Sequence, residues 1–197
     1  MAGRYLENHS TPQVLEAQER YYGRSRHVGH QPERDRLTEE ELTFIAQRDS
    51  FYMATVASNG WPYIQHRGGP RGFLKVIQPN VLAFADYGGN RQLLSTGNLS
   101  DNDRVALFLM DYPRRERLKI MGHARVLDAR EERNLATQVA DSSSLKAVER
   151  VFRVEVVSYD WNCPKYITPR FTEEEVRERM KPLLARIVEL EQELARR

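Results

Sequence analysis

Hydrophobic and polar residues alternate along the middle of the chain in a pattern typical of β-strands. The segment FYMATVA begins at Phe51, and Ser58-Asn59-Gly60 after it supplies the positive φ angles of a tight hairpin turn. The segment PYIQH is then the partner strand. Pro62 lacks an amide hydrogen, so it belongs at the start or edge of that strand. A β-hairpin is therefore predicted directly after residue 50.

Further hydrophobic segments follow, separated by turn signals such as Gln78-Pro79-Asn80 and Tyr112-Pro113. They are GFLKVI, VLAFADY, RVALFLMDY, LKIMGHARVLD and FRVEVVSYDW. In the last one, Phe152 and Val154 share one face and Arg153 takes the other. Five to seven short strands between residues 51 and 161 predict an antiparallel barrel, because closure removes the exposed edges of a flat sheet.

Two internal segments begin with the capping-box pattern that marks a helix start. The first, Thr38 to Glu41, precedes an apolar stripe and predicts a short helix that ends near Arg48. The second, Asp128 to Glu131, predicts a helix that runs to about Ala140. The fold class is therefore expected to be mainly β with flanking helices (α+β).

A third capping box, Thr172 to Glu175, opens an amphipathic helix over residues 172–197. Its apolar residues recur at spacings of four and three and form a seam that requires a partner surface: Val176, Met180, Leu183, Ile187, Leu190 and Leu194. That surface is either the chain's own barrel or a dimer partner, and the seam is too short to establish a coiled coil. Pro182 removes an interior hydrogen bond, so a kink or a restart is expected there.

The first 37 residues mix glycine, proline, histidine and many charges with little periodicity. They are interpreted as an N-terminal arm over residues 1–37, which either closes over a site or braces a dimer. The barrel domain is then expected over residues 38–171. One domain with appendages fits a chain of 197 residues.

Composition and charge exclude several classes of function. Hydrophobic residues make up 40% of the chain, and the net charge of +2 is too small to indicate nucleic-acid binding. The single cysteine, Cys163, cannot form an internal disulfide, and no paired Cys/His spacing indicates a metal site. No apolar run approaches the ~20 residues that cross a bilayer, and the charged start lacks the apolar core of a signal peptide. A cytoplasmic protein without membrane insertion is expected.

The most informative motif is Asp86-Tyr87-Gly88-Gly89-Asn90-Arg91-Gln92, which follows a strand and precedes LLSTGNL, a segment with the length of a helical turn. Two glycines let backbone amides converge on an anion, and a helix start adds a positive dipole. Arg91 offers a charged fork that matches phosphate. The motif predicts a phosphate cradle, although taken alone it also fits a glycine hairpin turn with a solvated arginine.

A second basic and glycine-rich segment lies upstream. The run from His66 to Lys75 places three basic side chains around a bend that enters a strand: Arg67, Arg71 and Lys75. Gly72 in that bend would let a planar ring lie close to the backbone. Downstream, Arg117 opens the strand RLKIMGHA. This wider context favours a phosphate site over an isolated turn.

The order of these motifs resembles the pyridoxamine 5'-phosphate oxidase family over roughly residues 40–171. The matching series is strand, Asn-Gly turn, strand, R-G-F-L-K strand, strand ending in an aromatic residue, G-N-R loop, N-x-R-V-A-L strand and R-L-K-I-x-G strand. The resemblance implies a six- to seven-stranded antiparallel split β-barrel. It also implies a homodimer that binds flavin mononucleotide (FMN) at the subunit interface.

The resemblance assigns a set of residues to FMN. Within that set, the loop from Asn90 to Gln92 would meet the phosphate or its approach, while Arg71 and Lys75 would lie on the ribityl-phosphate side. Gly72 and Phe73 would offer backbone contacts to the flavin edge. The full set is Arg67, Arg71, Gly72, Phe73, Lys75, Tyr87, Asn90, Arg91, Gln92, Arg117, Trp161 and Arg170.

Three members of the set, Arg117, Trp161 and Arg170, are expected at the flavin ring. Arg117 matches the place of a glutamine that reaches the ring, and a cation there would stabilise negative charge on a reduced flavin. Trp161 and Arg170 match a tryptophan and an arginine that cover FMN from the opposite subunit. Between them this chain has Cys163-Pro164-Lys165-Tyr166 in place of the basic, histidine-containing signature that reads pyridoxal phosphate. This difference argues against true pyridoxamine phosphate oxidase activity.

Three functions are compatible with these residues. The first is an FMN-dependent oxidoreductase acting on a small molecule by hydride or electron transfer. The second is a non-catalytic flavin-binding or stress-associated protein. The third is a split barrel that holds a deazaflavin or haem. Cys163, His66 and His123 are interpreted as structural residues unless they face the flavin.

Overall fold

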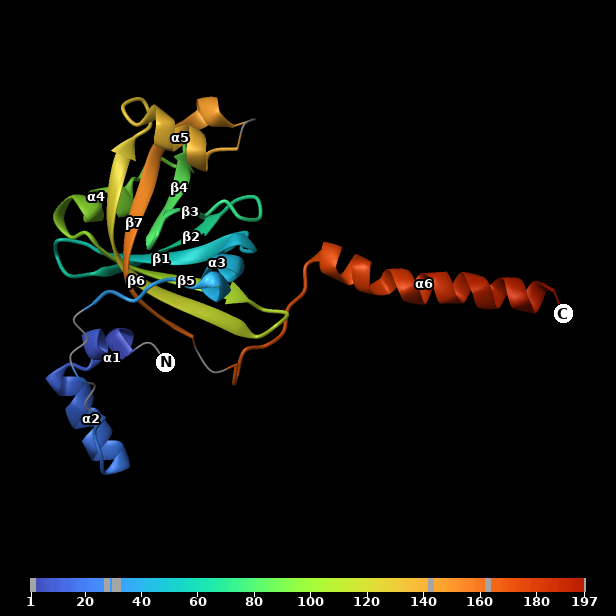
Figure 1. Ribbon diagram of the computed structural model, residues 1–197, viewed down its shortest axis with the longest axis horizontal. Coiled ribbons are helices and arrows are strands. Elements are labelled where there is room, and N and C mark those ends of the chain that lie inside the picture. Colours follow the sequence, from blue (N-terminus) through green and yellow to red (C-terminus); the bar gives the residue numbers. More distant parts are fainter. Residues whose placement is uncertain (1–2, 27–28, 30–32, 142–143, 162–163, 197) are drawn as a thin grey trace. The chain divides into compact units, whose positions relative to one another are not determined.

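The computed structural model describes residues 3–26, 29, 33–141, 144–161 and 164–196. Its strands are β1 (Ser50–Val56), β2 (Pro62–Gly68), β3 (Lys75–Gln78), β4 (Val81–Tyr87), β5 (Arg104–Asp111), β6 (Glu116–Asp128) and β7 (Val148–Trp161). Its helices are α1 (Gly3–His9), α2 (Pro12–Tyr22), α3 (Glu39–Ala46), α4 (Leu94–Asp101), α5 (Arg133–Val139) and α6 (Glu173–Ala195), with a 3-10 turn η1 (Leu145–Ala147). Figure 1 shows these elements in chain order.

The chain forms two compact units. The first comprises Met1–Met110 and Arg117–Cys163 and contains most of the sheet. The second comprises Asp111–Glu116 and Pro164–Arg197 and contains α6. No helix in the described part of the chain combines the length and the low charge that a membrane span needs.

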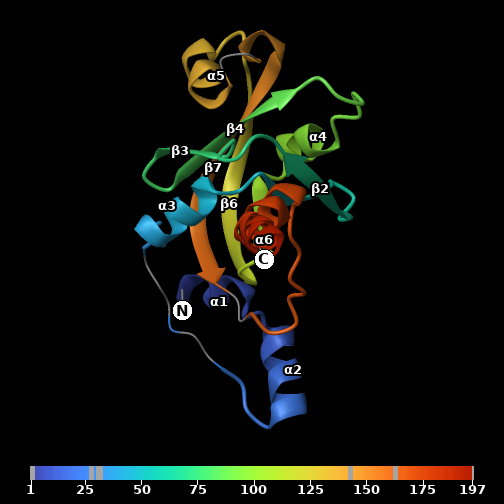
Figure 2. The same ribbon diagram turned by 90° about the vertical axis from the view of Figure 1, so that its right-hand side faces the viewer.

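The seven strands form one sheet in the order β2-β1-β5-β6-β7-β4-β3. Each pairing with a described register is antiparallel, and the long strands β6 and β7 lie side by side in both views (Figure 1, Figure 2). The β1–β2 hairpin turns at Gly60, whose φ of +87° is the conformation that the Asn-Gly pair predicts. The expected mainly β, antiparallel split barrel is confirmed.

The barrel core is formed by alternate residues of β1 and β5 and by buried residues of β4, β6 and β7. On β7, Phe152, Val154 and Val156 are fully buried, as the alternation in the sequence predicts. Phe84 of β4 stacks on Phe152 at a centroid distance of 5.0 Å and meets Phe51 of β1 edge-on at 5.3 Å. These rings join strands from both halves of the sheet order, so the curled sheet encloses one core.

Two of the predicted helices lie where the sequence places them. α3 begins after Thr38, whose backbone N–H and hydroxyl both donate to the Glu41 carboxylate at 2.8 and 2.6 Å. α4 covers the LLSTGNL segment and packs on β1 and β2, where Asn98 donates to the Thr55 hydroxyl at 2.9 Å. α4 therefore starts directly after the glycine-rich loop.

The second capping-box prediction is right about the end of its helix, since α5 ends at Val139, and wrong about the start. Asp128 ends β6, and its carboxylate accepts from the backbone N–H of Arg130 at 2.8 Å and from the Arg130 guanidinium at 2.7 Å. Those bonds close a turn, and α5 begins only at Arg133. The R-G-F-L-K segment also differs from expectation, because its strand begins at Lys75 and the preceding residues form a bend.

The N-terminal segment contains two helices that the lack of periodicity does not predict. Thr11 caps α2 by accepting from the N–H of Val14 at 3.4 Å, and Pro12 occupies the first helical position. Gly23, at a φ of +64°, ends the helix in the left-handed conformation. α1 packs on β7, with Asn8 donating to Ser158 at 3.5 Å.

The second unit contains the C-terminal helix. α6 begins at the predicted cap, where the Thr172 hydroxyl accepts from the N–H of Glu175 at 3.2 Å. The helix continues through Pro182 to Ala195, so the expected restart does not occur.

Candidate functional site

A cleft of about 550 Å³ lies where the loop after β4 meets the start of α4 and strands β2 and β7. This volume falls within the roughly 300–1,000 Å³ of small-molecule sites. The cleft brings together the predicted residues Arg67, Tyr87, Asn90, Arg91 and Gln92. The rest of its lining is formed by Tyr63, Gln65, Asp86, Gly89, Leu93, Leu94, Ser95, Thr96, Glu149 and Arg150.

The backbone of the loop turns sharply into α4. Arg91 and Leu93 adopt left-handed φ angles of +60° and +53°. Leu93 is the N-cap residue and provides no side-chain cap, so the first amides of α4 are available to an anion, which the helix dipole favours. Ser95 in the first turn is buried and donates to the Gln65 side chain at 2.9 Å.

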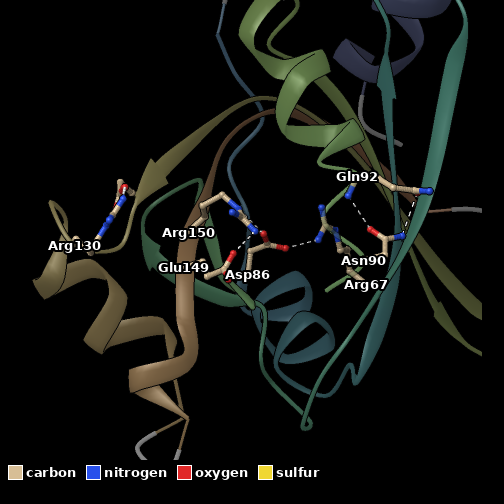
Figure 3. Close-up of polar contacts among 8 residues, drawn as sticks. Arg67, Asp86, Asn90, Gln92, Arg130, Glu149 and Arg150 are labelled. Carbon is tan, nitrogen blue, oxygen red and sulfur yellow. Dashed lines mark hydrogen bonds and ion pairs between the residues drawn. The ribbon is translucent and has the colours of Figure 1, made fainter. Parts of the chain in front are cut away.

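A charge network joins the two walls of the cleft (Figure 3). Asp86 on β4 accepts from Arg67 of β2 at 2.6 Å through one carboxylate oxygen and from Arg150 of β7 at 2.8 Å through the other. Arg150 also pairs with Glu149 at 2.9 Å. The side chains of Arg67 and Asp86 are each only 12% exposed, so this pair is shielded from solvent. Asp86 therefore holds two arginines at the cleft wall.

Arg67 still has bonding capacity within the cleft. Its guanidinium carbon lies 4.6 Å from the ring centre of Phe152 and 5.5 Å from that of Phe84. Its Nε is buried and has no hydrogen-bond partner among the described residues. A buried donor without a partner costs about 1–3 kcal/mol. An anionic ligand that reached this atom would recover that energy.

The predicted phosphate loop is exposed at the mouth of the cleft. The side-chain oxygen of Asn90 accepts from the backbone N–H of Gln92 at 3.1 Å, and the side-chain amide of Asn90 donates to the Gln92 side-chain oxygen at 3.1 Å. These two side chains thus fix the loop locally, as Figure 3 shows. Arg91 lies between them and is exposed. With Arg67 and Arg150 it gives the cleft three cations, against the two carboxylates of Asp86 and Glu149.

Two further basic residues of the prediction, Arg71 and Lys75, line a smaller cleft of about 150 Å³. Arg71, Phe73 and Lys75 contribute to it together with Tyr87, which lines both clefts. Arg71 and Lys75 are exposed. The two basic clefts are therefore neighbours across Tyr87.

The glycine in the R-G-F-L-K bend has a structural explanation. Gly72 has a φ of +77°, and a Cβ there would lie 2.8 Å from the carbonyl oxygen of Ala46. Its N–H donates to the Arg48 carbonyl at 2.8 Å. Glycine is thus required by the backbone, whether or not a ring approaches it. Phe73 stacks on Phe51 at 5.5 Å, which leaves only its backbone for a ligand.

The structure places Arg117 and Trp161 outside the linings of both clefts. Arg117 lies 5.8 Å from the Phe108 ring centre, and its Nε is buried without a partner among the described residues. The Trp161 indole donates to Glu41 at 2.6 Å and packs edge-on against Phe44. The Trp161 indole is therefore held by its own chain.

The pKa values of Glu41 and of its neighbour Tyr159 are both shifted by their surroundings. Burial disfavours its charge, but hydrogen bonds from Thr38 and Trp161 outweigh burial and lower the pKa of Glu41. Burial, together with the nearby charges of Glu41 and Asp35, raises the pKa of Tyr159 to about 12. These groups line a separate cleft and are interpreted as structural.

Four further residues singled out in the sequence have simpler outcomes. Arg170 lies in the second unit, with its guanidinium carbon 5.0 Å from the Tyr112 ring centre. His66 is exposed beside Tyr52, and His123 pairs with Asp103 at 2.9 Å. Cys163 lies outside the described residues. No group of His, Cys, Asp or Glu in the described ranges is arranged to hold a metal ion.

Sequence reasoning missed Arg150, Glu149 and the pairing role of Asp86. Asp86 belongs to the predicted loop, but its partners lie 19 and 64 residues away along the chain. In the FRVEVVSYDW segment the alternation identifies a strand, yet Glu149 and Arg150 precede that segment. The register of β4 with β7 pairs Asp86 with Arg150 directly. Only that register could have identified the contact.

Comparison with known proteins identifies a family whose model matches this chain. The model of the family described as pyridoxamine 5'-phosphate oxidase matches residues 37–160, which is more than half of the chain. A search of curated protein sequences finds no match.

Several solved structures are similar to the chain. HupZ of Group A Streptococcus is 12% identical with a TM-score of 0.49, over 68% of this chain and 100% of that one. General Stress Protein 26 of Bacillus anthracis is 16% identical with a TM-score of 0.47, over 68% and 95%. An FMN-binding protein of Syntrophomonas wolfei is 12% identical with a TM-score of 0.44, over 62% and 83%.

Proposed function

This chain belongs to the pyridoxamine 5'-phosphate oxidase family, and from that membership we propose that it is an FMN-binding flavoprotein, acting as an FMN-dependent oxidoreductase on a small molecule. The observation that carries the proposal is the basic cleft at the start of α4. It combines three arginines, open helix amides and the unpaired Nε of Arg67. This donor set suits a phosphate monoester.

The residues present fit FMN as follows. Arg91, with the amides at the start of α4, holds the phosphate, and Arg67 and Arg150 supply positive potential from the cleft wall. Arg71 and Lys75, beyond Tyr87, meet the ribityl side. The backbone of Gly72 and Phe73 contacts the flavin edge. Arg117 lies outside both clefts, so its buried Nε would meet the ring only where the flavin extends beyond them.

The flavin, when bound, supplies hydride or electron transfer, and the chain's residues bind and orient it. A homodimer would complete the site, with Trp161 and Arg170 of the second chain at the ring. Trp161 would then have to exchange its hydrogen bond to Glu41 for a contact with the cofactor.

The lining of the cleft favours FMN over haem. Among its described residues the cleft contains no histidine, cysteine or methionine as an axial iron ligand, and only Tyr63 and Tyr87 could take that role, whereas its three arginines suit a phosphate. A deazaflavin with a phosphate would fit the same cations. The absorbance spectrum of the purified protein distinguishes the three cofactors.

The experiment that tests the proposal is a pair of titrations of the cofactor-free protein with FMN and with riboflavin. The two ligands share the ring and differ by the phosphate. Charge-assisted hydrogen bonds contribute about 1.5–3 kcal/mol each, so FMN should bind at least tenfold more tightly. Equal affinities would exclude this cleft as a phosphate site. Anaerobic reduction of the bound flavin by NADH or NADPH then tests the oxidoreductase assignment.

A further inference from the structure

The C-terminal helix α6 carries a continuous apolar stripe on its surface. Written as heptads, the stripe places Met180, Ile187 and Leu194 at a positions and the intervening Val176, Leu183 and Leu190 at d positions. No residue of α6 is buried. The exposed fractions of the apolar side chains are Val176 42%, Met180 46%, Leu183 65%, Leu184 50%, Ile187 50%, Val188 50%, Leu190 42% and Leu194 69%.

A stripe of this kind favours a helical partner. A helix whose apolar face stays in water gains little beyond intrinsic propensity, and packing supplies most helical stability in proteins. The three a and three d residues of α6 give six core layers in a two-stranded pairing. Pro182 falls at an outward c position and leaves the stripe uninterrupted. The geometry therefore accommodates a second helix along the full length of α6.

The charges beside the stripe identify that helix. The e and g positions of the first half of α6 are basic, at Arg177 and Arg179, and those of the second half are acidic, at Glu191 and Glu193. A helix with basic and acidic halves is complementary to a copy of itself that runs in the opposite direction. The chain thus contains its own complementary surface.

An antiparallel alignment matches both the layers and the charges. It places Met180 opposite the d position of the second copy's Leu190, and Ile187 opposite Leu183. The same alignment sets Arg177 against Glu191 and Arg179 against Glu193, twice each by symmetry. Leu184, an e residue at the midpoint, then faces its own counterpart and extends the apolar contact.

One like-charge contact remains at the centre of this alignment. Arg186 meets its own counterpart, but each Arg186 already pairs with Glu189 at 2.9 Å and lies 3.8 Å from Glu193 in its own helix. A parallel, in-register pairing gives fewer attractive contacts, because only Arg186 faces an acidic residue, Glu191. The antiparallel arrangement is therefore favoured by charge.

We propose that α6 pairs with α6 of a second copy of this chain as an antiparallel two-stranded coiled coil. The inference does not depend on flavin binding. It assigns to the C-terminal helix an assembly function of its own, with the second copy as its partner.

The test uses the full-length chain with Cys163→Ser and one reporter cysteine, crosslinked by a short bis-maleimide. Leu184→Cys lies next to its counterpart only in the antiparallel pairing. Met180→Cys lies next to its counterpart only in a parallel one, because the antiparallel alignment offsets the two copies by ten residues, about 15 Å along the helix. Gln192→Cys, at an outward f position, is the background control. We expect the crosslinked dimer at Leu184 to exceed that at either of the other positions by about tenfold or more.

Charge reversal provides a second, independent measurement with the Leu184→Cys reporter. Arg177→Glu with Arg179→Glu makes all flanking contacts of an antiparallel pair repulsive, and so does Glu191→Arg with Glu193→Arg. Each double variant alone should yield about tenfold less crosslinked product. A mixture of the two, distinguished by a mass tag, should recover the wild-type yield as a heterodimer.

Three results would overturn the proposal. Preferential crosslinking at Met180 would show parallel pairing. An unchanged yield for Arg177→Glu with Arg179→Glu would remove the charge complementarity on which the direction rests. Background crosslinking at Leu184 would show that α6 is unpaired or covered by its own chain. Circular dichroism of each variant verifies that α6 remains helical.

Discussion

Replacing Asp86 by asparagine should move stability and cofactor affinity in opposite directions. The Asp86 carboxylate forms ion pairs with Arg67 at 2.6 Å and with Arg150 at 2.8 Å. The substitution Asp86→Asn removes the negative charge between these cations and keeps the shape of the side chain. The two arginines then repel each other across a neutral amide. The same change raises the positive potential of the cleft that is proposed to bind phosphate.

The stability cost follows from the burial of the network. Breaking a fully buried ion pair costs about 3–5 kcal/mol, whereas exposed pairs contribute about 0–1 kcal/mol. The side chains here are 12% exposed for Arg67 and Asp86 and 20% for Arg150, so the pairs fall between these limits. We expect a loss of about 1–3 kcal/mol, at roughly 2–4 °C of Tm for each kcal/mol in a chain of this size.

The gain in FMN affinity comes from Coulomb attraction. A unit charge about 10 Å from a phosphate contributes about 1.7 kcal/mol at an effective dielectric constant of about 20. Salt screening makes this an upper value, so FMN should bind roughly three- to fifteenfold more tightly to Asp86→Asn. The difference from wild type should shrink as ionic strength rises.

The assay is urea unfolding of the cofactor-free protein beside FMN titration at low and high salt. Glu155→Gln is the matched control, because Glu155 also pairs with two arginines, Arg153 at 2.6 Å and Arg34 at 3.3 Å, but does not line the cleft. It should leave FMN affinity unchanged. An unchanged or weaker FMN affinity in Asp86→Asn would refute the view that Asp86 tempers the positive charge of a phosphate site.

Three other predictions follow from the same structure. Arg91→Ala should weaken FMN binding by roughly ten- to more than a hundredfold, because it removes one charge-assisted contact, and it should leave Tm unchanged. The control Arg130→Ala should alter neither FMN binding nor Tm. An unchanged dissociation constant for Arg91→Ala in the titration would remove Arg91 from the site. Glu41→Gln should destabilise the protein at neutral pH, because the folded-state pKa of Glu41 lies below its ordinary value of 4.5. That contribution is present above pH 4.5 and is lost as pH falls through the lower folded-state pKa, so unfolding curves of the two proteins should converge in acid; a gap that persists there would contradict the titration. The FMN-loaded protein should oxidise pyridoxamine 5'-phosphate far below 1 s⁻¹, the low end of ordinary enzymes, because the stretch after Trp161 offers few cations for a second phosphate; steady-state turnover at or above that rate would restore the oxidase assignment.

Elements specified by neighbouring residues could be predicted from the sequence. Asn59-Gly60 set the β1–β2 turn, and the capping box at Thr38 set the start of α3. The alternation on β7 identified its buried face. In each case the atoms that decide the structure belong to residues a few positions apart, so a pattern in the sequence carries the same information as the fold.

The same capping pattern failed at Asp128 for a physical reason. A carboxylate at a helix start must be available to backbone amides inside the helix. Here Arg130 takes the Asp128 carboxylate with its guanidinium and its own N–H, and the chain turns before α5 begins. Both residues can be read in the sequence. Whether the Asp128 carboxylate bonds Arg130 or the amides of a helix depends on where β6 ends, and the local pattern does not specify that position.

The candidate site was predicted only in part. The residues of its loop are adjacent in the sequence, whereas the residues of its wall come from strands far apart in the sequence. Asn90 to Gln92 lie together in any conformation, so their grouping needed no tertiary information. The wall depends on how the sheet curls, because Arg67 and Asp86 belong to β2 and β4, which are not hydrogen-bonded neighbours in the sheet. No periodicity within either strand encodes that closure.

The charge balance of the wall indicates what the cleft is built to hold. Asp86 fixes Arg67 and Arg150 before any ligand arrives, so neither arginine has to lose side-chain freedom on binding, which is the usual cost of ordering such residues. The cleft contains three arginines and two carboxylates, Asp86 and Glu149, so it carries an excess of one positive charge. A stronger excess would bind any anion and would repel itself in the empty site. A small excess held in rigid geometry would instead favour a ligand that also meets the amides of α4 and the exposed Arg91, as the proposed phosphate monoester would.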